Sequence, residues 1–251
     1  MFKIDKKMSE RIIHTTNRVH IGEINISGIN YFVKPDDELK EVIGYYLARL
    51  FHLNCAKYRS VKINNKNYSI SADLNYHSLF MLAHTFSFDD MELNEIIEAL
   101  RSLSFFNENL EKDMIRMYLY DILFMNDDRH DRNWGILMQE EARVALIDNG
   151  AIFRVTGKPY IRFDDSMYFN KSVSSAIYED FLLFYESLDN ENRLMVDHYI
   201  KSVTPNSIKN VFLAIENYYQ CQINPLFLQI YEDHYKEILK TLSERMCNYG
   251  R

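Results

Sequence analysis

Residues 126–153 read NDDRHDRNWGILMQEEARVALIDNGAIF, and this stretch decides which fold we expect for the chain. It follows an apolar run that predicts a buried helix over about 114–124. WGIL and RVALID flank the polar turn MQEEA, which predicts a hairpin. Such a hairpin brings Asn133 at its entrance close to Asp148 at its exit. Amide and carboxylate oxygens are ligands that Mg²⁺ prefers, so the stretch predicts a metal site.

The spacing of these polar residues also suits phosphoryl transfer. Asp128 and Asn133 have the separation of the Asp and Asn in a kinase catalytic loop, and Asp148-Asn149-Gly150 stands where the kinase Asp-Phe-Gly motif would fall. NDDRHDRNWGIL followed by ALIDNGAIF resembles the HipA-like branch of the protein-kinase superfamily, which includes bacterial toxin kinases and secreted effector kinases. The Asp-Arg-His-x-x-x-Asn form of the loop is also similar to that of phosphatidylinositol-type kinases.

The resemblance implies an α+β, two-lobed, protein-kinase-like fold. A small N-lobe would span residues 1–75, and a larger helical C-lobe with the catalytic loop would span residues 76–251. The implied activity is ATP- and Mg²⁺-dependent phosphorylation of a serine or threonine hydroxyl on a protein. Asp128 would be the catalytic base, and Asn133 and Asp148 would bind Mg²⁺. His130 would brace the loop by hydrogen bonds, although a role as general base stays open.

A purely structural reading of the same loop also exists. Turn formation alone accounts for Asp127, Asp131 and Asn149, since Asp and Asn are common in loops between a helix and a strand. The combination of Asp128, Asn133 and Asp148 favours catalysis over that reading. Zinc binding by His130 is not expected, because no second His or Cys lies at ligand spacing.

The N-terminal third predicts a small sheet with one helix. Residues 18–34 indicate two strands with a tight turn at Ser27-Gly28, and Pro35 ends the second strand. Asp36 and Asp37 are candidate caps for a helix over about 38–52. Two further strands, 57–63 and 67–72, are joined by turn residues at 64–66. Beyond residue 88 the pattern is mostly helical, with candidates at 176–187, 190–202, 205–220 and 225–247.

Lys34, at the end of the second strand, resembles the lysine that contacts ATP phosphates in kinases. As an isolated residue it fits equally well a strand-end lysine that extends into solvent. Glu41 best matches the partner glutamate of that lysine, yet a helical wheel puts it opposite the apolar stripe, and Glu38 competes for the role.

The resemblance also implies how ATP is held elsewhere. Segment 69–75, which contains Asp73, would contact adenine through its backbone. The chain has no G-x-G-x-x-G loop, so the backbone N–H groups at Ser27-Gly28 would bind phosphate instead.

Composition limits the other function classes. The formal net charge of −7 argues against nucleic-acid binding and against an anionic membrane surface. No apolar run approaches a membrane span, and the N-terminus lacks the pattern of a cleaved signal peptide. Cys55, Cys221 and Cys247 lack a disulfide or zinc pattern. We therefore expect a cytoplasmic protein, or one secreted into a host cell without a cleaved signal, that acts on a protein substrate and has a cognate regulator or antitoxin.

Three alternatives to a protein kinase stay open at this point. A small-molecule kinase of the antibiotic- or sugar-phosphorylating type would need an acidic pocket, to which the carboxylates at 164–165 and 179–180 could contribute. A lipid kinase shares the loop form but would need a basic or amphipathic membrane face. A pseudokinase would bind nucleotide and partners without turnover, a reading that the missing glycine-rich loop favours.

Overall fold

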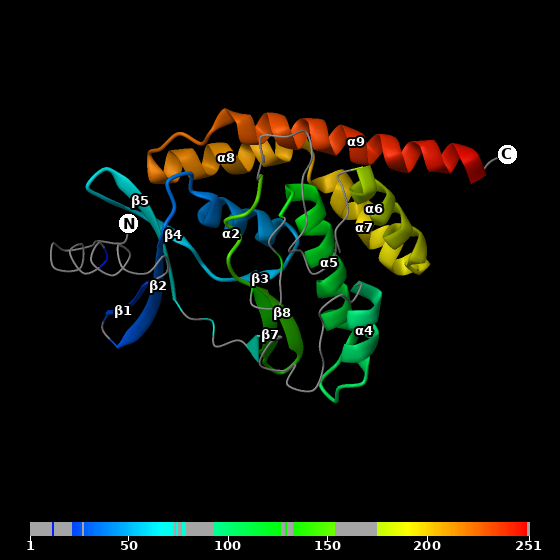
Figure 1. Cartoon of the computed structure of the whole chain (residues 1–251), viewed down its shortest axis with the longest axis horizontal. Coiled ribbons are helices and arrows are strands. Elements are labelled where there is room, and N and C mark those ends of the chain that lie inside the picture. Colours follow the sequence, from blue (N-terminus) through cyan, green and yellow to red (C-terminus); the bar gives the residue numbers. More distant parts are fainter. Residues whose placement is uncertain are drawn as a thin grey trace.

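The computed structural model describes residues 12, 22–26, 28–72, 74, 77–78, 93–126, 129, 133–153 and 175–249 (Figure 1). The strands are β1 (Gly22–Ile26), β2 (Ile29–Pro35), β3 (Asn54–Cys55), β4 (Arg59–Ile63), β5 (Lys66–Ala72), β6 (His77–Ser78), β7 (Trp134–Met138) and β8 (Ala142–Leu146). The helices are α2 (Lys40–Leu50), α4 (Leu93–Arg101), α5 (Glu108–Phe124), α6 (Ser175–Ser187), α7 (Asn190–Ser202), α8 (Pro205–Tyr219) and α9 (Pro225–Tyr249). This mixture confirms the expected α+β class.

The N-terminal sheet is antiparallel throughout, with strand order β1-β2-β5-β4. The β1–β2 turn uses Gly28 at φ +83°, and its N–H donates to the side chain of Asn25. The β4–β5 turn has Asn64 and Asn65 both at positive φ, as the tightest hairpin turns require. The predicted strands and turns of this sheet are therefore confirmed, although Ser27 lies outside the described residues.

The two faces of this sheet differ in polarity. One face forms a separate apolar cluster that includes Val33, Tyr68 and Ile70 and is covered by Ile12. The opposite face carries Lys34, together with Ser69, which pairs with Lys34 across the strands, and Ser71, which pairs with Phe32. Both serines are buried, and Phe32 is exposed. Because side chains alternate along a strand, Lys34 projects from the polar face toward the rest of the molecule.

A second sheet holds the hairpin predicted from RVALID and WGIL. β7 and β8 pair antiparallel, with Trp134 opposite Leu146. Two strands of two residues each, β3 and β6, extend this sheet to the order β3-β8-β7-β6. The sequence did not predict them, because a strand of two residues is too short to show alternation.

Helix α2 belongs to the main core of the molecule. The N-cap residue of α2 is Leu39, whose side chain cannot accept a hydrogen bond. The carboxylate of Asp36 does so instead and accepts hydrogen bonds from the N–H groups of Lys40 and Glu41 at 2.8 and 3.2 Å. Val42, Ile43 and other apolar residues of α2 pack into the same cluster as α5 and the C-terminal helices. In Figure 1, α2 lies between the N-terminal sheet and the pair α8 and α9, and contacts α8.

The C-terminal half is helical, as predicted. Helix α5 is buried along most of its length and contacts β8, α7 and α9. Asn107, Asp189 and Thr204 cap the N-termini of α5, α7 and α8 by accepting backbone N–H bonds. No helix of the described residues is long and apolar enough to cross a membrane. A lobe boundary between residues 75 and 76 stays a prediction, and the apolar clusters show that α2 shares its core with the C-terminal helices.

Candidate active site

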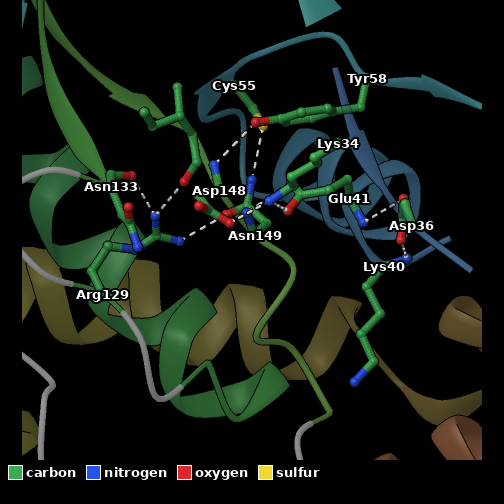
Figure 2. Close-up of polar contacts among 11 residues, drawn as sticks. Lys34, Asp36, Lys40, Glu41, Cys55, Tyr58, Arg129, Asn133, Asp148 and Asn149 are labelled. Atoms are coloured by element: carbon green, nitrogen blue, oxygen red, sulfur yellow. Dashed lines mark hydrogen bonds and ion pairs between the residues drawn. The ribbon is translucent and has the colours of Figure 1, made fainter. Parts of the chain in front are cut away.

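A cavity of about 520 Å³ opens where β2, the N-terminus of α2 and the segment after β8 meet. Its walls include Lys34, Asp36, Glu41, Asp148 and Gly150. Lys34, Asp36 and Glu41 lie close together in the sequence and far from Asp148 and Gly150, and Figure 2 shows the side chains of Lys34, Glu41 and Asp148 converging on one another. The cavity therefore gathers charged groups from two distant parts of the chain, residues 34–41 and 148–151.

Lys34 lies between two carboxylates. Its Nζ is 2.5 Å from Oδ1 of Asp148 and also forms an ion pair with Oε1 of Glu41. The Glu41 side chain is 1% exposed and that of Asp148 is 30% exposed. Glu41 is thus the buried partner that fixes the lysine, and Asp148 is the partner that solutes in the cavity can reach.

Burial and charge set the pKa values of this cluster. Burial raises the pKa of Glu41 to about 7, although Lys34 opposes the shift. Burial also disfavours charge on Lys34, but Glu41 and Asp148 outweigh it and raise the pKa of the ammonium. For Asp148, Lys34 outweighs the cost of burial and lowers the pKa of the carboxyl group. Lys34 and Asp148 are therefore charged at neutral pH, and Glu41 is the group that titrates near it.

Asp36 is the other carboxyl group on this wall whose protonation is shifted. Burial raises its pKa to about 6, while the hydrogen bonds from Lys40 and Glu41 oppose the shift. Its oxygens accept bonds from the first turn of α2, so its position is fixed by the helix rather than by Lys34. This arrangement keeps the start of α2, and Glu41 with it, close to the cavity.

The backbone at Asp148 has an unusual conformation. Asp148 has φ +51°, in the left-handed region that few residues other than glycine adopt. Its N–H donates to the hydroxyl of Tyr58 at 3.1 Å, and the N–H of Asn149 donates to Oε2 of Glu41 at 3.0 Å. A Cβ at Gly150 would stand 2.7 Å from Oε1 of Glu41. The Asp-Asn-Gly turn therefore fits closely against the Glu41 carboxylate, and a side chain at Gly150 would have to displace it.

A buried arginine lies behind this turn. Arg129 is fully buried and forms an ion pair with Asp121 of α5, with Nε at 3.0 Å from Oδ2. It also donates to the carbonyl oxygens of Asn133 and Ile147 at 2.7 and 3.0 Å, and to Oδ1 of Asn149 at 2.8 Å. Figure 2 shows the guanidinium reaching from the segment before Asn133 to the segment that carries Asp148.

Two solved structures are similar to this arrangement of elements. The proinflammatory kinase CtkA of Helicobacter pylori matches with a TM-score of 0.62 and 16% identity, over 88% of this chain and 90% of that one. HipA of Shewanella oneidensis MR-1, solved with HipB and operator DNA as a toxin–antitoxin system, matches with a TM-score of 0.62 and 11% identity, over 94% of this chain and 72% of that one. The chain has a HipA-like protein-kinase fold.

Sequence identities of 16% and 11% establish the fold alone. No protein-family model matches the chain. No curated protein matches it in sequence either. The structural similarity to CtkA and HipA confirms the two-lobed, kinase-like fold class expected from residues 126–153.

Within the kinase-like fold, the structure brings together some of the predicted site residues. Lys34 contacts both Glu41 and Asp148. Asn133 directly precedes the first strand of the β7–β8 hairpin, and Asp148 follows the second strand. Glu38, the competitor of Glu41, is exposed and pairs with Lys40 instead. The remaining predicted site residues, Asp128, His130, Ser27 and Asp73, lie outside the described residues, so their roles stay predictions.

The donor set suits the cofactors that the fold implies. Lys34 supplies a fixed cation for phosphate, and Asp148 beside it is an oxygen donor of the hard type that Mg²⁺ prefers. Asn133, the other predicted donor, is buried at the start of the hairpin. Among the described residues, no three His, Cys, Asp or Glu side chains form a metal-binding group. The described part of the chain thus has a fixed cation and a hard oxygen donor on one cavity wall, which fits nucleotide phosphates with a metal ion.

The sequence reading missed several residues that hold the site. Asp121 stands inside the apolar run that predicts a buried helix, and Arg129 follows in the loop. A buried charged residue needs a partner of opposite charge, so this pair could have been predicted from the sequence. Tyr58 and Gly44 carried none, because each acts through a contact with a residue distant in the sequence.

Gly44 permits a close approach between α2 and the Asp-Asn-Gly turn. A Cβ at this position would stand 2.5 Å from Cβ of Asn149 and 3.2 Å from the hydroxyl of Tyr120. We expect Gly44→Ala to lower the free energy of unfolding by about 1–3 kcal/mol through overpacking. In an ordinary helix the same substitution stabilises by roughly 0.5–1 kcal/mol, so urea unfolding distinguishes the two by the sign of the change. A stabilised variant would show that α2 does not approach the turn this closely.

Proposed function

We propose that the protein is an ATP- and Mg²⁺-dependent kinase that transfers the γ-phosphate to a serine or threonine hydroxyl of a protein. The observation that carries the proposal is the convergence of Lys34, Glu41 and Asp148 on one cavity in a HipA-like protein-kinase fold. Asp148 comes from more than a hundred residues further along the chain than Lys34 and Glu41, and the lysine meets both carboxylates there, although a structural ion pair would need only two partners.

Each residue has a distinct role in this proposal. Lys34 binds the phosphates and is held in place by the buried Glu41 carboxylate. Asp148 and Asn133 would hold Mg²⁺, which would supply positive charge beside the phosphate oxygens. Ser27 and Asp73, from the predicted phosphate-covering turn and adenine-binding segment, complete the nucleotide site.

The transfer step follows from these roles. Asp128 accepts the proton of the attacking hydroxyl, while His130 braces the loop that carries it. The hydroxyl oxygen forms a bond to the γ-phosphorus, the bond from that phosphorus to the bridging oxygen breaks, and ADP leaves with the electron pair. Lys34 stabilises the charge on the departing phosphates.

The acceptor and the partner are proposed by analogy with the named neighbours. CtkA is described as a proinflammatory kinase, and HipA was solved with HipB and operator DNA as a toxin–antitoxin system. We propose a protein acceptor and a cognate protein regulator for this chain, acting in a bacterial or host cytoplasm. The net charge of −7 gives no support to direct nucleic-acid binding.

One observation favours a small-molecule acceptor as the second candidate. The lining residues of the cavity include five with a carboxyl side chain: Asp36, Asp37, Glu38, Glu41 and Asp148. The lining residues with a basic side chain are Lys34 and Lys40. Such a wall would attract a cationic acceptor, as in kinases that phosphorylate aminoglycosides.

The test is transfer of labelled γ-phosphate with Mg²⁺, first to the protein itself, then to a lysate, then to a panel of aminoglycosides. We expect label on protein and none after removal of Mg²⁺ with a chelator. Asp128→Ala should lower the rate by at least about 10²-fold, as removal of a general base does, with ATP binding retained. Label on aminoglycosides alone would support the second candidate. Binding of Mg²⁺-ATP without any transfer would make the chain a pseudokinase.

A further inference from the structure

Arg129 is a buried ionisable group that the proposed mechanism does not use. Its Nε and Nη2 hold the Asp121 carboxylate, and both side chains are 0% exposed. Asp121 also accepts a bond from Asn126 at 2.7 Å, so the end of α5 is tied to the start of the catalytic loop. A buried ion pair contributes little net stability compared with apolar residues of the same size. Stability alone therefore does not account for Arg129 and Asp121 at these positions.

Three further bonds of Arg129 end at or beside a predicted metal ligand. Nη1 donates to the carbonyl of Asn133, which also accepts the N–H of Ile147, and to the carbonyl of Ile147 itself. Nη2 donates to the side chain of Asn149. The guanidinium therefore joins the backbone at one predicted Mg²⁺ ligand to the residues on both sides of the other.

These bonds fix the peptide plane that precedes Asp148. The carbonyl of Ile147 and the N–H of Asp148 belong to one planar unit, and Arg129 binds the carbonyl while Tyr58 binds the N–H. Asp148 stays at φ +51° under these constraints, in a conformation that costs about 1 kcal/mol for a residue with a Cβ. Loss of Arg129 would free one side of this plane.

We propose that Arg129 is a positioning residue that sets the distance and orientation between Asn133 and Asp148, and that phosphotransfer depends on it through Mg²⁺ binding. The inference rests on the proposed kinase function. Lysine cannot replace it, because a single ammonium does not reach acceptors on both strands and Asp121 at once.

The chain offers a matched control in Arg143. This residue also holds a buried carboxylate of α5, with its Nε and Nη2 at 2.6 and 2.9 Å from the oxygens of Asp113. It lies on β8 close to the turn of the hairpin, at the opposite end from Asp148. Arg143→Lys therefore perturbs the same helix and the same hairpin without touching the metal-binding end.

The experiment compares Arg129→Lys and Arg143→Lys with the wild type in phosphate transfer at varied Mg²⁺ and ATP. For Arg129→Lys we expect a kcat about 10- to 100-fold lower and a tenfold higher Mg²⁺ concentration for half-maximal rate, as for partners of metal ligands. KM for ATP at saturating Mg²⁺ should change less than about threefold. Arg143→Lys should leave all three values unchanged even where its Tm falls.

Equal Mg²⁺ dependence and kcat in the two variants would overturn the inference and leave the kinase proposal intact. If Arg129→Lys does not fold, Asp121→Asn takes its place, since it weakens the grip on the guanidinium and should shift the Mg²⁺ dependence in the same direction. A wild type without transfer, and without any change in the fluorescence of Trp134 on addition of Mg²⁺-ATP, would overturn the proposed function and this inference together.

Discussion

Replacing Asp148 with asparagine should lower the rate of phosphate transfer by at least about 10³-fold, because a metal that stabilises transition-state charge contributes several kcal/mol. The substitution removes the carboxylate charge and keeps the shape of the side chain. Asparagine also tolerates the left-handed backbone that this position requires at φ +51°. Mg²⁺-dependent ATP binding, measured by calorimetry with and without the metal, should weaken in parallel.

Asp37→Asn is the control for this prediction. Asp37 lines the same cavity and is exposed, so its removal changes the charge of the wall by the same amount. We expect a rate within about twofold of the wild type, since screened surface charges contribute little. If the Asp148→Asn variant keeps a tenth of the wild-type activity, Asp148 is not a ligand of the metal ion.

Much of the fold could be predicted because its long elements have clear periodicity. The hairpin of β7 and β8 and the helices from α5 to α9 each extend over enough residues for the pattern to show. The two-residue strands β3 and β6 could not be found in this way, since their pairing depends on a partner elsewhere. The parallel pairing of β3 with β8 is supported by a bond from the Asn54 side chain to the carbonyl of Val144, which no local pattern encodes.

Glu41 shows why the helical wheel misled the reading of the site. The wheel assumes that a helix has one wet face, and it put Glu41 on that face. Helix α2 instead buries residues around most of its circumference, with apolar residues in the main core and Glu41 against Lys34 and the Asn149 N–H. The motif resemblance pointed to Glu41, which the structure places beside Lys34, because a motif encodes a pairing and not a hydrophobicity pattern.

Loss of Lys34 should be the most damaging single change to stability in the cluster. Lys34→Met leaves the Glu41 carboxylate 1% exposed and without its ammonium. Removal of one partner of a buried ion pair costs roughly 3–5 kcal/mol, and we expect a loss near the lower limit at pH 8 because Glu41 can bind a proton. Phosphate transfer should be lost as well, since the lysine that Glu41 holds in place for the phosphates is gone.

The pH dependence of this loss identifies its cause. The pKa of Glu41 is about 7 in the folded wild type against 4.5 for the free side chain, and without Lys34 it must rise further. The unfolded chain then releases the proton first, so stability falls as pH rises from about 4.5 through and beyond 7. Urea unfolding at pH 5, 6.5 and 8 should show the Lys34→Met variant approaching the wild type at pH 5 and separating from it at pH 8.

The double variant Lys34→Met/Glu41→Gln separates charge from shape. Glutamine keeps an oxygen that can accept the Asn149 N–H bond, and it carries no charge that burial would penalise. We expect it to recover about 2 kcal/mol relative to Lys34→Met at pH 8 and to lose the added pH dependence. It should stay inactive, because the phosphate-binding cation is still missing. A double variant as unstable as the single one would mean that Lys34 stabilises the fold through packing of its side chain, and that the buried carboxylate needs no cation.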